Sequence, residues 1–360
     1  MTRSPRIRTW PLALLTAFSC LLTPANSQAA QPFLLQMIRD DAVHQELQLT
    51  DSQIDQVYEA IAQVDPRWWI SRITPAEKQQ AEIQQLTDQL QTSLDELLNA
   101  DQRLRLQQLV RQAHGTRMAR SPGVAEALQL TTEQLADLET RFTETDTKVA
   151  AIQKQLAAKD TTPQAAAQEI AQAQQNERQG ILETLTTEQQ TAIGPLVGKS
   201  FNFSAIKRTY PRAPEFITEG ATWIGESPVR MQDLRGKVVA VYFYAFQCIN
   251  CQRNFPHYKS WHDDLADEGL VVIGIQTPET SAERDPKRVQ EAYRSDEFQF
   301  PVLFDEASNN WRAWGNTMWP TTYLIDKQGF IRRWWQGEMN WQGTLGEQQM
   351  RESIQTLLAE

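Results

Sequence analysis

Apolar residues recur at every third or fourth position through the first half of the chain, from about residue 33 to 195. Leu86, Leu90, Leu94 and Leu97 have this spacing, which places them along one face of a helix. The same stretch is rich in Gln, Ala, Leu and Glu and poor in glycine, a composition that favours helix. These patterns predict an all-helical domain over residues 31–195.

A short polar pattern interrupts this periodicity and predicts where helices begin. Leu-Thr-x-x-Gln, or a weaker variant of it, stands at 49–53, 98–102, 130–134 and 185–189. The Thr or Asn can cap the first helical turn, and the Gln three residues later can reach back to it. Thr74 and Thr162 mark two further starts, each followed by proline. The six starts form two sets of three, which predicts an internal duplication.

After residue 216 the pattern changes to short apolar runs that alternate with helical stretches. Residues 196–216 bring Gly and Pro together and predict a linker. Strands are predicted at 238–244, 270–276, 301–304 and 322–325. Helices are predicted at 251–266, 286–293 and 346–358. The alternation predicts an α/β domain over 217–360, with helices flanking a mixed, mostly parallel central sheet.

The first 30 residues resemble a secretory signal peptide. Arg3, Arg6 and Arg8 precede an apolar run from 10 to 22, which is too short to span a bilayer. Cys20 lies in that run, but bulky Phe18 makes a poor lipidation signal, so we expect the segment to be cleaved. The mature chain is therefore predicted to be exported, to the periplasm or another extracytoplasmic space. Membrane contact is expected only if the signal is retained or Cys20 is lipidated.

Composition narrows the possible partners. The chain has 360 residues, 41% of them hydrophobic, which fits two domains with sizeable cores. Its net charge of −10 disfavours nucleic acid and anionic lipid, because both are bound through clusters of Lys and Arg.

The candidate catalytic residues are Cys248 and Cys251, the two cysteines that remain once Cys20 is removed with the signal. They follow the predicted strand 238–244 directly and open the next helix. Thiol–disulfide exchange needs a thiolate, and a helix N-terminus favours the anion. We predict that Cys248 is the nucleophile and that Cys251, one turn further on, resolves the mixed disulfide.

Further landmarks follow in order along this half. They are Leu234-Arg-Gly-Lys-Val-Val-Ala-Val, Cys248-Ile-Asn-Cys251, Pro256 and Trp319-Pro320-Thr321-Thr322. In these features the chain resembles the thioredoxin superfamily, and within it the exported TlpA/ResA and DipZ C-terminal group. The resemblance implies a thioredoxin-like fold, a redox-active Cys248–Cys251 disulfide, and a cis-proline at 320 that faces the cysteines.

The same resemblance implies substrate contacts and partners. Trp319, Pro320 and Thr321 would form the substrate-binding surface beside the cysteines. The partners would be protein thiols or disulfides and an upstream redox protein, with no cofactor and no metal.

Two positions depart from thioredoxin itself. Tyr242 stands where thioredoxin has a buried acid, and Gln247 replaces the aromatic residue before the first cysteine. Four other acids could carry protons instead: Glu226, Asp233, Asp326 and Glu338.

The same part of the chain argues against several other functions. His257 and His262 follow the cysteines, but their spacing does not fit a zinc finger, and copper carriers of this fold space their cysteines more widely. Ala245 and Val241 do not match the peroxiredoxin motif. The Leu-Thr-x-x-Gln elements are similar to those of the helical Spy/CpxP periplasmic stress proteins. We therefore predict an exported thiol–disulfide oxidoreductase, with a chaperone-like or copper-binding protein as the alternatives.

Overall fold

The structure is a computed structural model that describes residues 33–225 and 228–360. The predicted signal peptide, Cys20 and Glu226 lie outside these residues. The described chain forms two compact units, one of residues 33–58 and 76–207 and one of residues 59–75 and 208–360. This grouping differs from the predicted domains, because residues 59–75 fold with the C-terminal part of the chain.

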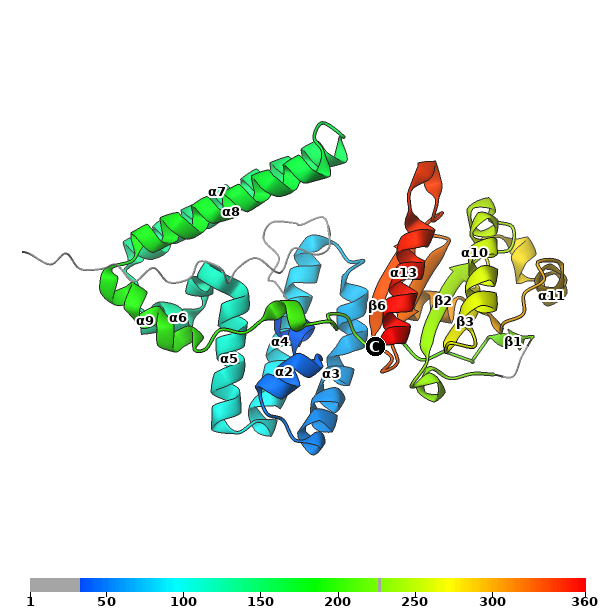
Figure 1. Ribbon diagram of the computed structural model, residues 1–360, viewed down its shortest axis with the longest axis horizontal. Helices are drawn as coiled ribbons and strands as arrows, with labels where there is room; N and C mark the ends of the chain where they lie inside the picture. The colour runs from blue at the N-terminus through cyan, green and yellow to red at the C-terminus, as the bar shows by residue number, and fades with distance from the viewer. Residues whose placement is uncertain (1–32, 226–227) are drawn as a thin grey trace, which may run out of the picture. The chain divides into compact units, whose positions relative to one another are not determined.

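The first half of the chain is helical (Figure 1). Its α-helices are α1 (Phe33–Met37), α2 (Asp41–Glu46), α3 (Asp51–Ser71), α4 (Ala76–Leu97), α5 (Ala100–His114), α6 (Pro122–Ala127), α7 (Thr132–Ala157), α8 (Pro163–Thr184) and α9 (Thr187–Val197). α7 and α8 are long and lie side by side as an antiparallel hairpin.

The predicted helix starts are confirmed. α5, α7 and α9 each begin with a capping box, formed by Asn99, Thr131 and Thr186 with the glutamine three residues later. The Thr162 side chain caps α8 in the same way without the reciprocal bond, and α4 begins two residues after Thr74. Each box gives a side-chain acceptor to two backbone N–H groups that the helix end would otherwise leave unbonded.

The capping glutamines also bond to one another. Gln53 Nε2 donates to Gln102 Oε1 at 2.9 Å, and Gln134 Nε2 donates to Gln189 Oε1 at 2.8 Å. In each predicted repeat, the capping glutamine of one helix start thus donates to the capping glutamine of another.

The second unit is built on one mixed sheet of six strands in the order β1-β4-β3-β2-β5-β6. The strands are β1 (Thr222–Ile224), β2 (Val238–Tyr244), β3 (Leu270–Gln276), β4 (Val302–Phe304), β5 (Thr321–Ile325) and β6 (Ile331–Gln336). Its α-helices are α10 (Ile249–Leu265), α11 (Pro286–Ser295), α12 (Asn309–Ala313) and α13 (Gly346–Ala359). β2, β3 and β4 run parallel, whereas β1, β5 and β6 each pair antiparallel with their neighbours.

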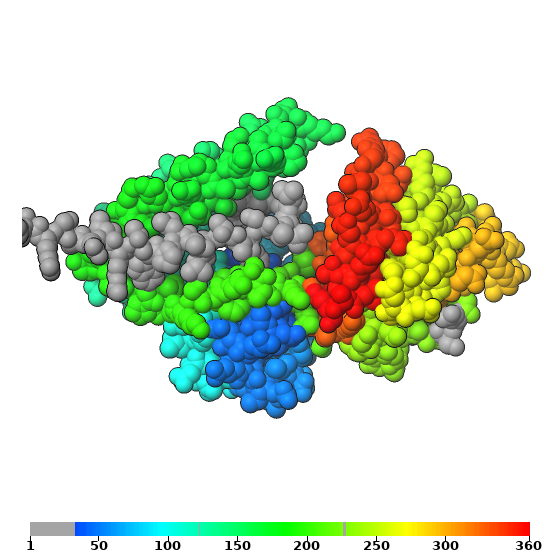
Figure 2. All heavy atoms as spheres, viewed as in Figure 1, coloured from blue at the N-terminus to red at the C-terminus, as the bar shows by residue number. Residues whose placement is uncertain are grey.

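β2 lies at the centre and is buried along its whole length. Alternate side chains of a strand point to opposite faces of the sheet. Val238, Ala240, Tyr242 and Tyr244 face a core that includes residues of α10 and α13. Figure 2 shows α13 in red beside α10 in yellow-green on that side of the unit. Two covered faces explain why the strand is an uninterrupted apolar run.

The opposite face of the sheet is covered partly by the end of α3. Trp69 packs with Val241, Phe243 and Tyr323 in this second core, and its indole Nε1 donates to the carbonyl of Trp314 at 2.9 Å. α3 continues through Pro66 to Ser71, so Trp68 and Trp69 lie in its last turn. Proline has no N–H, so the helix loses one backbone hydrogen bond at Pro66. The free energy gained by burying the Trp69 indole offsets that loss.

No helix in the described ranges is both long enough and apolar enough to cross a membrane.

Candidate active site

The site begins where β2 ends. After Tyr244 the chain turns through Ala245, and the backbone N–H of Cys248 donates to the Ala245 carbonyl at 3.1 Å. Cys248 is the N-cap residue of α10, and its carbonyl accepts from the N–H groups of Cys251 and Gln252 at 3.0 Å each. A buried strand and a helix N-terminus thus fix the two cysteines, as the sequence predicted.

The two thiols differ in environment. Cys248 is partly exposed, whereas Cys251 is fully buried, and both are free thiols in this structure. A hydrogen bond from the Cys251 thiol, helped by backbone N–H groups of Cys251 and Asn250, lowers the pKa of Cys248 from 9.0 to about 7. Burial, together with the hydrogen bond to Cys248, raises the pKa of Cys251. The outer sulfur is therefore the one that ionises near neutral pH, and thiolate is the reactive form.

A buried glutamate supports the turn that carries the cysteines. Glu283 is fully buried, and one carboxylate oxygen accepts the backbone N–H of Gln247 at 2.8 Å. Its other oxygen accepts the N–H groups of Glu279 and Thr280 at 2.9 and 2.8 Å. The Gln247 side chain accepts from the Thr280 hydroxyl at 3.1 Å. The loop after β3 is thereby tied to the residue that precedes the nucleophile.

Sequence reasoning missed Glu283 and Glu279. Both follow the end of β3, which runs parallel to β2, so both strands end at the same edge of the sheet. Loops after neighbouring parallel strands meet at that edge, and this topology was the available signal. The negative charge of Glu279 acts to raise the pKa of both cysteines.

The predicted substrate-binding residues lie at the start of β5. The Trp319–Pro320 peptide bond is cis, as the resemblance implied. Trp319 and Cys248 both pack against the core that contains Cys251. Trp319 also stacks on Trp311 at 3.9 Å between ring centroids and donates from Nε1 to the Thr277 carbonyl at 3.2 Å. The buried Thr321 hydroxyl donates to the Met318 carbonyl at 2.8 Å, so this side chain is turned inward.

A second set of bonds links the proline to α10. The Gly337 N–H, just after β6, donates to the Pro320 carbonyl at 2.8 Å. The buried side chain of Asn254 donates to the Gly337 carbonyl at 3.1 Å and accepts the Met339 N–H at 3.0 Å. Asn254 lies one turn beyond Cys251, so the loop 337–339 is fixed to both the proline and the cysteine helix.

Tyr242 does not replace the buried acid of thioredoxin. Its ring stacks on Tyr258 at 3.9 Å between ring centroids, and among residues 33–225 and 228–360 its hydroxyl has no hydrogen-bond partner. Burial raises its pKa well above 10.0, so the phenol stays protonated at neutral pH.

The other predicted proton carriers in the described residues lie at opposite ends of the central sheet. The register of β2 and β5 pairs Phe243 with Thr321 at the cysteine end and Val239 with Ile325 at the other. Asp326 follows Ile325, and Asp233 precedes β2, so both lie at the end away from the cysteines. Glu338 follows β6 at the cysteine end, where it pairs with Arg253 of α10 at 3.0 Å.

The histidines after the cysteines do not join them. His257 contacts the Asn340 amide at 3.4 Å, and the ring of His262 packs against Phe300. Across residues 33–225 and 228–360, no three His, Cys, Asp or Glu side chains come together as a metal site would require.

Comparisons with known proteins cover this unit. The profile of the AhpC/TSA family matches residues 211–334. The thioredoxin-like protein YneN of Bacillus subtilis (strain 168) is 34% identical over 122 residues, which are 34% of this chain and 67% of YneN. The chain belongs to the thioredoxin-like family.

Two further relatives match about a third of the chain. Protein DipZ of Mycobacterium bovis (strain ATCC BAA-935 / AF2122/97) is 37% identical over 131 residues, 36% of this chain and 19% of DipZ. The chain thus spans about a fifth of the length of this relative. The thiol-disulfide oxidoreductase ResA of Halalkalibacterium halodurans is 28% identical over 129 residues, 35% of this chain and 68% of ResA. These relatives support a redox role at the level of the family.

Proposed function

We propose that this chain is an exported thiol–disulfide oxidoreductase that acts on proteins through Cys248 and Cys251. The observation that carries the proposal is the asymmetry of the pair. One sulfur is partly exposed with a pKa of about 7, and the other is buried with a raised pKa. Export is proposed from the signal-like pattern of residues 1–30.

The reaction has two balanced steps. The Cys248 thiolate attacks one sulfur of a substrate disulfide, forms a mixed disulfide and releases the other substrate sulfur as a thiolate. Cys251 then loses its proton and attacks the Cys248 sulfur, which releases the second substrate thiol and leaves a Cys248–Cys251 disulfide. An upstream dithiol protein reduces that disulfide again.

The reverse sequence oxidises a substrate dithiol instead. The reduction potential of the pair relative to that of its compartment decides the net direction. Pro320 and Trp319 are proposed to border the substrate chain, since Trp319 and Cys248 pack against the same core.

A trapping experiment tests the proposal. We expect the Cys251→Ser variant to accumulate a mixed disulfide with a peptide disulfide, because Cys248 attacks and nothing resolves the product. Mass spectrometry should locate the adduct on Cys248. The Cys248→Ser variant is the matched control and should give no adduct above the uncatalysed background. Equal adduct formation in both variants, or none in either, would contradict the proposal.

A further inference from the structure

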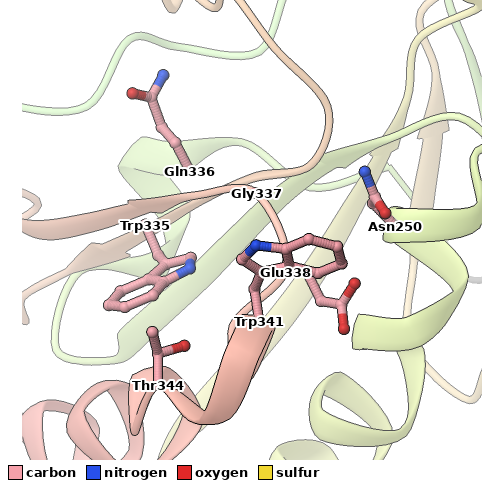
Figure 3. Close-up of a pocket in the computed structure, with 7 residues that line it drawn as sticks. All are labelled: Asn250, Trp335, Gln336, Gly337, Glu338, Trp341 and Thr344. Atoms are coloured by element: carbon pink, nitrogen blue, oxygen red, sulfur yellow. The ribbon is translucent and has the colours of Figure 1, made fainter.

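A pocket beside the cysteine turn takes no part in the exchange steps. Its volume is about 350 Å³. It is lined by Asn250, Trp335, Gln336, Gly337, Glu338, Trp341 and Thr344 (Figure 3). Asn250 lies between the two cysteines, so the pocket borders the helical turn that carries them.

The pocket has a fixed position relative to the reacting sulfur. Gly337, in its wall, donates to the Pro320 carbonyl at 2.8 Å, and the Gly337 carbonyl accepts from Asn254 of α10 at 3.1 Å. The opposite side is held by the Thr344 hydroxyl, which donates to the Met339 carbonyl at 2.7 Å. A side chain bound here would belong to a residue close to the reactive cysteine of the substrate.

The lining combines two indoles with one carboxylate. Trp335 and Trp341 face the same space in Figure 3, with Glu338 beside Trp341. Trp341 is 52% exposed, which is unusual for so large an apolar side chain. One Glu338 oxygen accepts from Arg253 at 3.0 Å, and within the described parts of the chain its other oxygen has no hydrogen-bond donor.

We propose that this pocket binds a Lys or Arg side chain of the substrate protein, near its reactive cysteine. The proposal rests on the proposed function. The faces of indole rings attract cations, and Trp attracts them most strongly of the aromatic residues. A cation also pairs with the free oxygen of Glu338, whereas a neutral side chain would shield that carboxylate from water without replacing its hydration. The net charge of −10 also favours association with basic partners.

Matched peptide disulfides test the preference. Three peptides would differ only at one residue near the cysteine, which is Lys, norleucine or Phe. For each, kcat/KM is divided by the rate constant with bis(2-hydroxyethyl) disulfide, which has no side chain to fill the pocket. We expect the Lys peptide to exceed the norleucine peptide by about threefold to tenfold at low salt. The ratio should fall as salt is raised, because the carboxylate contributes.

Variants of the lining separate charge from shape. Glu338→Gln and Trp341→Ala should each bring the Lys-to-norleucine ratio close to one. Arg253→Gln is the matched control for Glu338→Gln, because it breaks the same ion pair but leaves the carboxylate. The ratio in Arg253→Gln should therefore stay the same or rise.

The outcomes distinguish the pocket from the redox function. Equal rates for the three peptides, or a preference for Phe, would overturn the cation pocket while the exchange activity stands. If no disulfide reacts, the proposed function fails, and tryptophan fluorescence then decides the pocket. Quenching by a cysteine-free Lys peptide that is absent in Trp341→Ala would support the pocket, and equal quenching by a norleucine peptide would overturn it.

Discussion

The two ends of the central sheet each contain a polar cluster, and the clusters are built in opposite ways. At one end Asp326 is buried, and its carboxylate accepts from Arg208 at 3.1 Å, Arg332 at 3.3 Å and the N–H groups of Gln328 and Phe330. Every oxygen there has partners. At the other end Cys248 keeps one side exposed, and its neighbours stabilise its anion without neutralising it.

The contrast separates a structural site from a reactive one. A charge that is surrounded by partners holds the chain in place and offers nothing to a substrate. A thiolate held by one thiol and a few N–H groups remains available for attack. Glu283 belongs to the first kind although it lies at the cysteine end, because it is buried and bonded to three backbone N–H groups.

The largest expected effect is on stability, from the Asp326→Asn substitution. It leaves two arginines facing an uncharged amide, and breaking a buried ion pair of this kind costs about 3–5 kcal/mol. Denaturant unfolding should show this loss, while the pKa of Cys248 should not change. Asp233→Asn is the control, because its ion pair with Arg230 is exposed and should contribute no measurable stability. A shift in the Cys248 pKa would show that the two ends are coupled.

A smaller effect is expected at Trp69, which supports the face of the sheet turned away from the cysteines. The Trp69→Phe substitution keeps most of the buried ring but removes the hydrogen bond to the Trp314 carbonyl. Because Arg72 also donates to that carbonyl, at 2.7 Å, the lost hydrogen bond should lower the free energy of unfolding by only about 1 kcal/mol. The volume that the smaller ring leaves unfilled adds to this loss. Trp341→Phe is the exposed control. If both variants unfold at the same denaturant concentration, Trp69 is not part of this core.

Local chemistry made much of the fold predictable from the sequence. The helix starts were found because a cap is a bond between residues three positions apart, such as Thr131 and Gln134. β2 and α10 were found because an apolar run followed by Cys-x-x-Cys needs no distant residue to be recognised. The cis bond before Pro320 was predicted from the family resemblance, and the structure contains it.

What the sequence did not reveal depends on distant contacts. β6 was missed because Arg332 and Arg333 break its apolar run, and its pairing with β5 determines it instead. Trp69 joins the second unit through a partner 245 positions away, Trp314. Among the suggested proton carriers in the described chain, Glu338 alone lies at the cysteine end of the sheet. This follows from the register of the strands, which the sequence does not reveal.

The reactivity of the two thiols as a function of pH tests the central claim most directly. The reduced protein would be alkylated with iodoacetamide from pH 5 to 10, and each cysteine quantified by mass spectrometry. Thiolate reacts and thiol does not, so modification of Cys248 should fall about tenfold per pH unit well below a midpoint near 7. Cys251 should stay unmodified across the range while the protein is folded. A Cys248 midpoint near 9, or equal modification of both cysteines, would contradict the account.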